Sequence, residues 1–186
     1  MARLSVSDIQ RDHNRHMAQW QESTCRRRLI DLLSARLTTT SWGSRPNVSR
    51  AVCLGIGSFD PEDGAWEVKR RAHIQLAAFL TIVTTLRDYQ GRHDGQDESQ
   101  SQNEHQQKPQ PIRCFFQEPM FTPSDKDFIR ALGHEFEVVE SPRGFELVDN
   151  NTLVFGVHLY RDIYSRAIAG CAPAIFVGTG LNVWEE

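Results

Sequence analysis

The sequence predicts an α/β fold in three layers, a sandwich with helices on both faces of a mostly parallel sheet of about five strands. Short apolar runs alternate with helical segments, the order expected of strands joined by crossover helices. The first run, residues 51–54, is apolar throughout, as in a strand buried on both faces. It ends in Gly55 and Gly57, and a helix is expected over residues 66–89. Strand, glycine turn and helix form the first unit of a Rossmann-like fold, whose ligand crevice lies at the carboxyl ends of the strands.

The glycine turn is the first candidate site. Two glycines allow backbone conformations closed to other residues and let a ligand approach the main chain. Gly55, Gly57, Ser58 and Phe59 are therefore candidate ligand-binding residues. The dinucleotide fingerprint places a third glycine close to the second and starts its helix at once, whereas residues 59–64 intervene here. A ligand turn and a plain strand-to-helix turn remain as alternatives, and both fit better than a dinucleotide site.

Composition limits the classes of function. A chain of 186 residues suits one domain with a full core, and a net charge of −3 gives no reason to expect a nucleic-acid partner. No segment resembles a signal peptide or has the apolar length of a membrane helix, so no membrane association is expected. The four cysteines lie far apart with no C-x-x-C pair. We therefore expect reduced thiols in a cytoplasmic or nuclear protein.

Residues 1–49 are expected to form an N-terminal helical segment that packs on a domain of residues 50–186. A helix is predicted over residues 7–37, with a capping box of Ser7 and Gln10 and a polar middle at 21–28 that is a candidate break. His13 and His16 share a helix face but lack a nearby carboxylate or thiolate, so no metal site is predicted. The run of arginines at 26–28 reads as a solvated face or as a contact for an acidic partner.

The middle of the chain contains a polar insertion and two further strands. Residues 90–111 hold no aliphatic or aromatic side chain, so they are predicted to be a disordered insertion. A strand over 112–118 ends in Glu118, where a Rossmann fold carries the carboxylate that binds a ribose. A surface or helix-capping acid is the alternative. A helix opened by Thr122 and Pro123, a strand over 136–140 and a short antiparallel excursion over 145–148 follow.

The last two strands complete the predicted site. The run 152–158 ends in His158, a candidate acid, base or ligand contact, or simply a histidine bonded to main chain. After a helix over 160–169, the run 174–178 ends in a glycine turn at Gly178. If the strand order is 3-2-1-4-5, Glu118 and His158 flank the glycine turn from opposite sides, roughly 10 Å apart.

The sequence resembles the Sensitivity to Red Light Reduced (SRR-like) family over about residues 52–181. The resemblance rests on V-C-L-G-I-G-S-F at 52–59, the helix containing Gln75-Leu76-Ala77, and Glu118-Pro119-Met120-Phe121 after the second strand. The T-x-x-D-K pattern at 122–126, the strand entered through Asn151-Thr152-Leu153, and His158 add to it. The chain departs from the family at Gly156-Val157-His158-Leu159, where the family has Met-Pro-His-Cys, and at V-G-T-G-L in the last strand, where the family favours glycine followed by Asn-Ser-Phe.

The resemblance implies a regulatory or sensing protein linked to light and clock signalling, to stress or to haem biosynthesis. It brings no agreed reaction, and any chemistry that needs the missing cysteine is in doubt here. A nucleotide-type ligand or haem is implied only by resemblance. Haem gets little support from the residues, because no cysteine is followed by proline and the only available axial ligands are histidines or Cys171.

Three functions remain. The first is a regulatory protein with a small-molecule crevice at the strand ends, and the second is a methyltransferase-like or nucleotide-dependent enzyme. In the enzyme, Glu118 would hold a ribose and His158 would act as acid or base with Ser58. The third is an interaction domain, with a protein partner, whose crevice is only packing. A bound adenine nucleoside would favour the second, and a filled crevice would favour the third.

Overall fold

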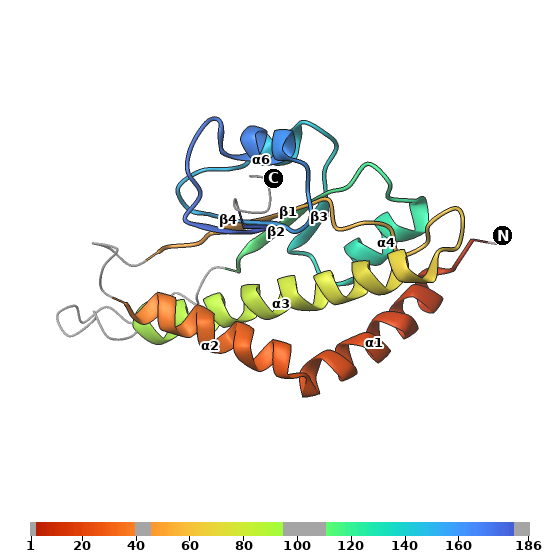
Figure 1. The fold of residues 1–186 in the computed structure, drawn as a ribbon, viewed down its shortest axis with the longest axis horizontal. Helices are drawn as coiled ribbons and strands as arrows, with labels where there is room; N and C mark the ends of the chain where they lie inside the picture. The colour runs from red at the N-terminus through yellow and green to blue at the C-terminus, as the bar shows by residue number, and fades with distance from the viewer. Residues whose placement is uncertain (1–2, 40–45, 95–110, 181–186) are drawn as a thin grey trace.

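The fold is built on a sheet of five strands, shown edge-on in Figure 1. The structure, a computed structural model, describes residues 3–39, 46–94 and 111–180. All neighbouring strands are parallel and follow the order β3-β2-β1-β4-β5, which matches the expected order. The strands are β1 (Arg50–Leu54), β2 (Arg113–Gln117), β3 (Phe136–Val138), β4 (Thr152–Gly156) and β5 (Ile175–Gly178).

Helices cover both faces of the sheet, which confirms the three-layer prediction (Figure 1). Crossover connections between parallel strands are right-handed, so the helices that join β1 to β2 and β2 to β3 lie on one face of the sheet. After β3 the chain moves across the sheet in the opposite direction, so the helices that follow lie on the other face. The first face carries α1 (Val6–Glu22), α2 (Thr24–Thr38), α3 (Trp66–Asp94) and α4 (Pro123–Ala131). The second carries α5 (Arg143–Glu146) and α6 (Arg161–Ile168).

The larger core lies between the sheet and α3. Phe79 of α3 is fully buried, and its ring lies 5.2 Å from that of Phe116 in β2 and 5.7 Å from that of Phe155 in β4. Burying one such side chain contributes about 1.5–3 kcal/mol. The opposite face has a smaller core around Val52, Phe115 and the α5–α6 layer.

The N-terminal segment is two helices, and the break falls inside the predicted polar stretch. Ser23 ends α1 and caps α2, since its hydroxyl donates to the Trp20 carbonyl and accepts from the Arg26 amide. The predicted capping box was wrong: it is formed by Ser5 and Asp8, and the helix begins earlier. The carboxylate of Asp8 at the third helical position accepts the Ser5 amide hydrogen bond and is also favoured by the helix dipole.

Two further predictions need correction. Residues 90–94, expected to be disordered, continue α3. The side-chain amide of Gln90 donates to the Val48 carbonyl at 3.2 Å. Residues 95–110 of the predicted insertion lie outside the described residues. The antiparallel excursion is absent from the described sheet: residues 143–146 form α5, whose Gly144 amide donates to the Gln117 side chain at 2.8 Å. That bond draws the segment onto β2 as a helical turn, overriding the β-propensity of its apolar residues.

Neither membrane spans nor paired cysteines are found in the part of the chain that is described. No helix there is both long and apolar enough to cross a bilayer. Cys53 and Cys114 are buried in β1 and β2, while Cys25 and Cys171 are exposed. Burial raises the pKa of the Cys114 thiol to about 12 and that of Cys53 well above its usual value, so both side chains are inert packing groups.

Candidate functional site

The predicted site residues come from the carboxyl edge of the sheet, defined here as the last residues of β1, β2, β4 and β5 and the loops that follow them. Gly55 follows β1, Glu118 follows β2, His158 follows β4, and Gly178 ends β5. They share one edge because all five strands run in the same direction. The edge divides into two parts, one on the β1–β2 side and one on the β4–β5 side.

On the β1–β2 side, Glu118 is bonded directly to the glycine turn. Gly55 and Gly57 have φ angles of 65° and 85°, which L side chains rarely adopt. The Gly57 amide donates to Oε2 of Glu118 at 2.8 Å, and the Met120 amide donates to Oε1 at 2.9 Å. Hydrogen bonds to a carboxylate are stronger than neutral ones, so Glu118 holds the turn in place. Among the residues that the structure describes, no other group donates to these two oxygens, so each keeps one further lone pair.

Ser58 points into the protein rather than toward the edge. Its side chain is buried, its hydroxyl donates to Oδ2 of Asp125 at 2.6 Å, and it accepts from the Asp60 amide at 3.0 Å. A nucleophilic serine must be open to substrate and must pass its proton to a base. The first condition is not met, because the Ser58 hydroxyl is enclosed in the interior and is not open to substrate.

Asp125 holds the glycine turn in place, a role that the sequence did not predict. It is fully buried at the N-terminus of α4, where its carboxylate also accepts the amides of Phe59 at 3.1 Å and Thr122 at 2.9 Å. The signal for it was the Thr-Pro-Ser-Asp capping pattern, read only as a helix start. Asp125 therefore ties the glycine turn to α4.

The chain before α1 is tied to the same turn. The Leu4 amide donates to Oδ2 of Asp60 at 3.1 Å, and the Arg3 guanidinium donates to the Asp60 carbonyl at 3.1 Å. Asp60 in turn donates its amide to Ser58. The glycine turn is thus held from three directions, by β2, by α4 and by the N-terminal segment.

Phe59 lies in an aromatic cluster under the turn. Its buried ring is 5.0 Å from Phe128 and 5.0 Å from His73, which in turn lies 5.7 Å from His13 and 5.2 Å from His16. Burial lowers the pKa of His13 to about 4 and that of His73 to about 3. No described group of His, Cys, Asp or Glu is arranged to hold a metal ion.

On the β4–β5 side, the half-buried side chain of Leu159 lies against the bare backbone at the ends of β1 and β4. A Cβ atom added to Gly55 would overlap the Leu159 Cδ2 atom, and one added to Gly156 would lie 2.7 Å from Cδ1. The bare backbone at the ends of β1 and β4 therefore accommodates Leu159. This is the position where the resembling family has cysteine in place of leucine.

Tyr164 fixes the main chain around Leu159. Its hydroxyl donates to the Gly156 carbonyl at 2.7 Å and accepts the amide of Thr179 at 3.0 Å. The His158 amide donates to the Thr179 hydroxyl at 3.0 Å, which joins the ends of β4 and β5. His158 takes part through its main-chain amide, so these bonds do not involve its imidazole ring.

The side chains that reach solvent at this edge include large apolar ones. His158 is exposed and has a φ of 60°, in the left-handed region that few residues other than glycine adopt. Trp66, Met120 and Tyr160 are 67%, 69% and 82% exposed, and each lies at the carboxyl edge: at the start of α3, after β2 and before α6. At Gly178 the space for a Cβ is limited by Phe176, 2.7 Å away, and by the Gly156 carbonyl.

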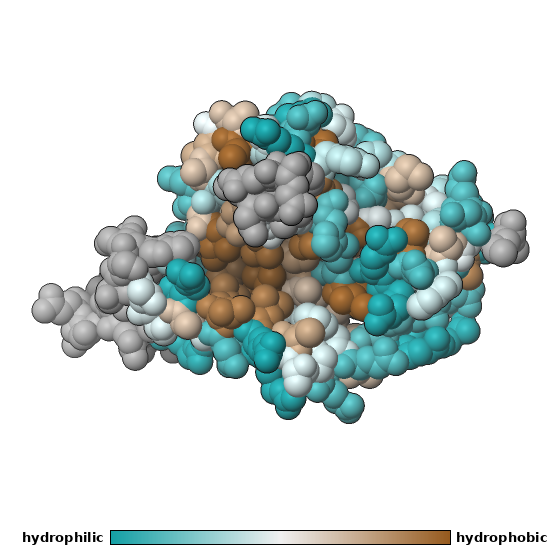
Figure 2. All heavy atoms as spheres, viewed as in Figure 1, coloured by the Kyte–Doolittle hydropathy of each residue, from teal (hydrophilic) through white to brown (hydrophobic). Residues whose placement is uncertain are grey.

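Two grooves lie away from this edge. One, of about 290 Å³, is apolar and lies between α2, α3 and β5, in the region where Figure 2 shows apolar residues gathered on the surface. The other, of about 710 Å³, lies between the α1–α2 bend and α3. Neither is lined by a histidine or by Cys171, the axial ligands that the sequence offered for haem, although Met17 lines the larger groove.

Comparison with known proteins gives one match. The family model of the SRR1 domain covers residues 29–186, which is most of the chain and begins inside α2. No match was found among curated proteins, and none among solved structures. The chain belongs to the SRR1 domain family.

Proposed function

We propose that this SRR1-domain chain is a regulatory protein that acts by binding a protein partner at the carboxyl edge of its sheet. The observation that carries the proposal is the position of Leu159, whose side chain occupies the hollow over Gly55 and Gly156. In Rossmann-like folds a ligand occupies that hollow, at the point where the strand order reverses. With that position occupied, the remaining contact surface is the rim of the edge, defined here by the exposed residues Trp66, Met120, His158 and Tyr160.

The exposed residues of the rim fit a protein partner. Trp and Tyr dominate the binding energy of protein interfaces, and Met is also enriched there. Trp66, Met120 and Tyr160 are three of the large hydrophobic side chains that the described chain exposes. His158 lies two residues before Tyr160 in the sequence and adds an exposed polar side chain to the rim. We place this activity in the cytoplasm or nucleus, where the unpaired thiols would remain reduced.

Catalysis has less support than binding. Ser58 is enclosed with Asp125, and the described residues place no hydrogen-bonded carboxylate on the His158 ring. A general base acts when a second group orients it. The rim therefore offers contact groups rather than an acid–base pair.

Affinity capture from the cells of origin tests the proposal. The tagged wild-type chain is compared with Tyr160→Ser and Met120→Ser, which remove exposed apolar side chains, and with Ile168→Ser as the matched control. Ile168 is 50% exposed at the far end of α6, close to the opposite edge of the sheet. The expected result is a partner retained by wild type and by Ile168→Ser but reduced at least tenfold in the rim variants. Equal recovery in all four would contradict the proposal.

A small-molecule crevice is the second candidate, and the placement of Glu118 favours it. Its carboxylate lies at the end of β2 beside the glycine turn, where a ribose-binding acid belongs, and each oxygen has a free lone pair. Leu159 must move for a nucleoside to enter. Calorimetry with adenosine is then expected to show binding that Leu159→Ala strengthens and Glu118→Gln weakens. Absence of heat for both wild type and Leu159→Ala would remove this candidate.

A further inference from the structure

A groove in the helical layer is separate from the carboxyl edge. It lies between the α1–α2 bend and α3, and we call it the bend groove. Its volume of about 710 Å³ is within the range of small-molecule sites, roughly 300–1,000 Å³. The lining residues are Met17, Gln21, Arg26, Ile30, Ser34, Leu80, Thr81, Thr84, Thr85, Arg87, Asp88, Arg92, Glu135 and Phe136.

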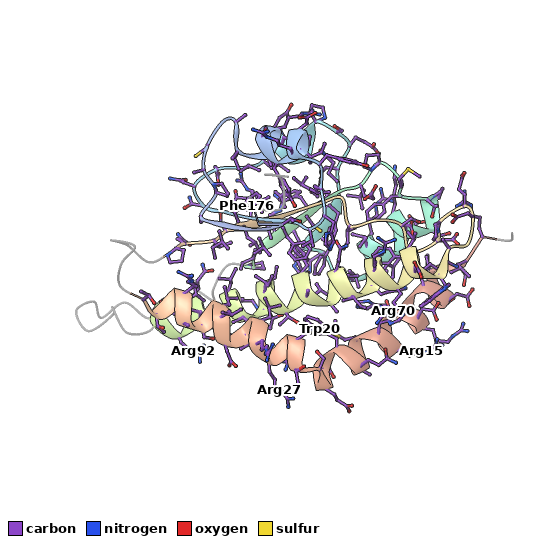
Figure 3. All side chains as sticks on the ribbon, in the orientation of Figure 1. Arg15, Trp20, Arg27, Arg70, Arg92 and Phe176 are labelled. Carbon is purple, nitrogen blue, oxygen red and sulfur yellow. The ribbon has the colours of Figure 1, made fainter. Side chains whose placement is uncertain are left out.

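The groove is open because the helical layer bends at Ser23. Ser23 has a ψ of 148°, so α2 leaves the direction of α1 at that residue. At the bend, the Trp20 indole N–H donates to the Thr81 hydroxyl of α3 at 2.9 Å, which fixes the spacing of the two walls. Figure 3 shows Trp20 between α1 and α3. The hollow is therefore part of the folded structure and does not need a ligand to form.

The lining combines an apolar floor with hydroxyl groups. Met17, Ile30, Leu80 and Phe136 supply apolar surface from α1, α2, α3 and β3. The hydroxyls of Thr81 and Thr85 donate to carbonyls of their own helix, so they face an incoming group as acceptors only. The polar and apolar parts of the lining are about equal, which suits a ligand that carries both an apolar body and a polar group.

Two arginines of the groove have no partner of their own. The guanidinium groups of Arg26 and Arg87 form no hydrogen bond or ion pair with any residue in the described ranges. Arg26 is half-buried, whereas Arg87 is exposed at the mouth of the groove. Arg92 donates to the carbonyl of Asp88 at 3.1 Å. By contrast, Arg11 and Arg15 on α1 pair with Asp8 and Asp12. A half-buried cation without a partner is set to accept an anion, which it can hold with paired hydrogen bonds.

We propose that the bend groove binds an amphipathic organic anion, with its sulfonate, phosphate or carboxylate group held by Arg26 and Arg87 and its apolar body on Met17, Ile30 and Leu80. Asp88 and Glu135 also line the groove, and they limit the ligand to an anion of low charge because a highly charged anion would be repelled. Three of the lining residues, at positions 17, 21 and 26, precede the part of the chain that matches the family model. The groove therefore combines residues from inside and outside the matched region.

Fluorescence titration with a matched pair of probes tests the site. The anionic probe is 8-anilinonaphthalene-1-sulfonate, and the neutral one is N-phenyl-1-naphthylamine, which lacks the sulfonate. Wild type is expected to bind one sulfonate probe per chain, at least tenfold more tightly than the neutral probe. Arg26→Gln and Arg87→Gln are each expected to weaken the sulfonate probe about tenfold while leaving the neutral probe unchanged, since a charge-assisted hydrogen bond is lost.

Two controls separate this groove from other surfaces. Arg27→Gln removes an exposed arginine that lies on the outer side of α2 (Figure 3), and it is expected to leave binding unchanged. Leu32→Ala alters the apolar groove beside β5, and it too is expected to have no effect. Equal affinity of wild type, Arg26→Gln and Arg87→Gln for the sulfonate probe would overturn the proposal. So would a loss in Leu32→Ala as large as in the arginine variants.

Discussion

The two sides of the carboxyl edge are built differently. On the β1–β2 side, the polar side chains of Ser58 and Asp125 are buried and bonded to each other, and Phe59 is enclosed in the core. On the β4–β5 side, main-chain bonds through Tyr164 hold the loop, while the side chains of His158 and Tyr160 reach solvent. Residues at strand ends in this fold therefore serve two purposes. Buried polar groups of the β1–β2 side stabilise the turn, and exposed side chains present a surface: Trp66 and Met120 on that side, and Tyr160 on the other.

The largest expected effect comes from removing Asp125. Asp125→Ala leaves the Ser58 hydroxyl and the amides of Phe59 and Thr122 without their acceptor in the interior. Each unsatisfied buried donor costs about 1–3 kcal/mol, so we expect a loss of at least 3 kcal/mol in the free energy of unfolding. Urea denaturation measures it.

The control for that variant lies two residues away. Asp127 is exposed and pairs with Arg130 at 3.0 Å. Asp127→Ala is expected to change the free energy of unfolding by less than about 0.5 kcal/mol, as surface pairs do. Similar losses in both variants would mean that the buried acceptor has no special role, and the division of the edge would fail.

The next largest effect is expected from acid, which should lower the free energy of unfolding through the histidines under the glycine turn. His13 and His73 have folded-state pKa values lowered to about 4 and about 3, against about 6.5 when unfolded. Below pH 6.5 the unfolded chain binds more protons than the folded one, so the free energy of unfolding falls as pH falls from about 6.5 toward 4. The slope is about 1.4 kcal/mol per pH unit for each histidine.

Replacing one histidine sharpens this test. His13→Leu removes one of the cluster's histidines, whose pKa values are all lowered, so the dependence of unfolding free energy on pH should become less steep by about one proton. Urea denaturation between pH 7 and pH 5 measures both slopes. A wild-type stability that stays constant over this interval would show that the cluster is open to solvent.

Much of the fold was predictable from local pattern. The apolar runs at β1, β2 and β4 mark buried parallel strands, and Gly55, Glu118 and His158 follow from where those runs end. The segment around Phe145 was misassigned because its residues favour a strand in isolation. The contact of Gly144 with Gln117, which makes it a helical turn, joins residues far apart in the chain.

The internal arrangement of the site depended on tertiary contacts that local pattern does not contain. Ser58 looked like a site residue because it follows a glycine, but its direction is set by Asp125, far along the chain. Leu159 carried no signal beyond its apolar character, since only the sheet order brings it over Gly55. The same limit applied to Trp20, whose bond to Thr81 spaces the helices of the bend groove.

The most direct test of this division compares Ser58→Ala with Tyr160→Ser in the affinity capture, at equal amounts of folded protein. Our account predicts that Ser58→Ala loses about 1–3 kcal/mol of unfolding free energy, because the Asp125 carboxylate and the Asp60 amide lose a partner, yet still retains the wild-type amount of partner. Tyr160→Ser should keep its stability within about 0.5 kcal/mol and lose the partner. A folded Ser58→Ala that no longer retains the partner, alongside a Tyr160→Ser that does, would contradict the account.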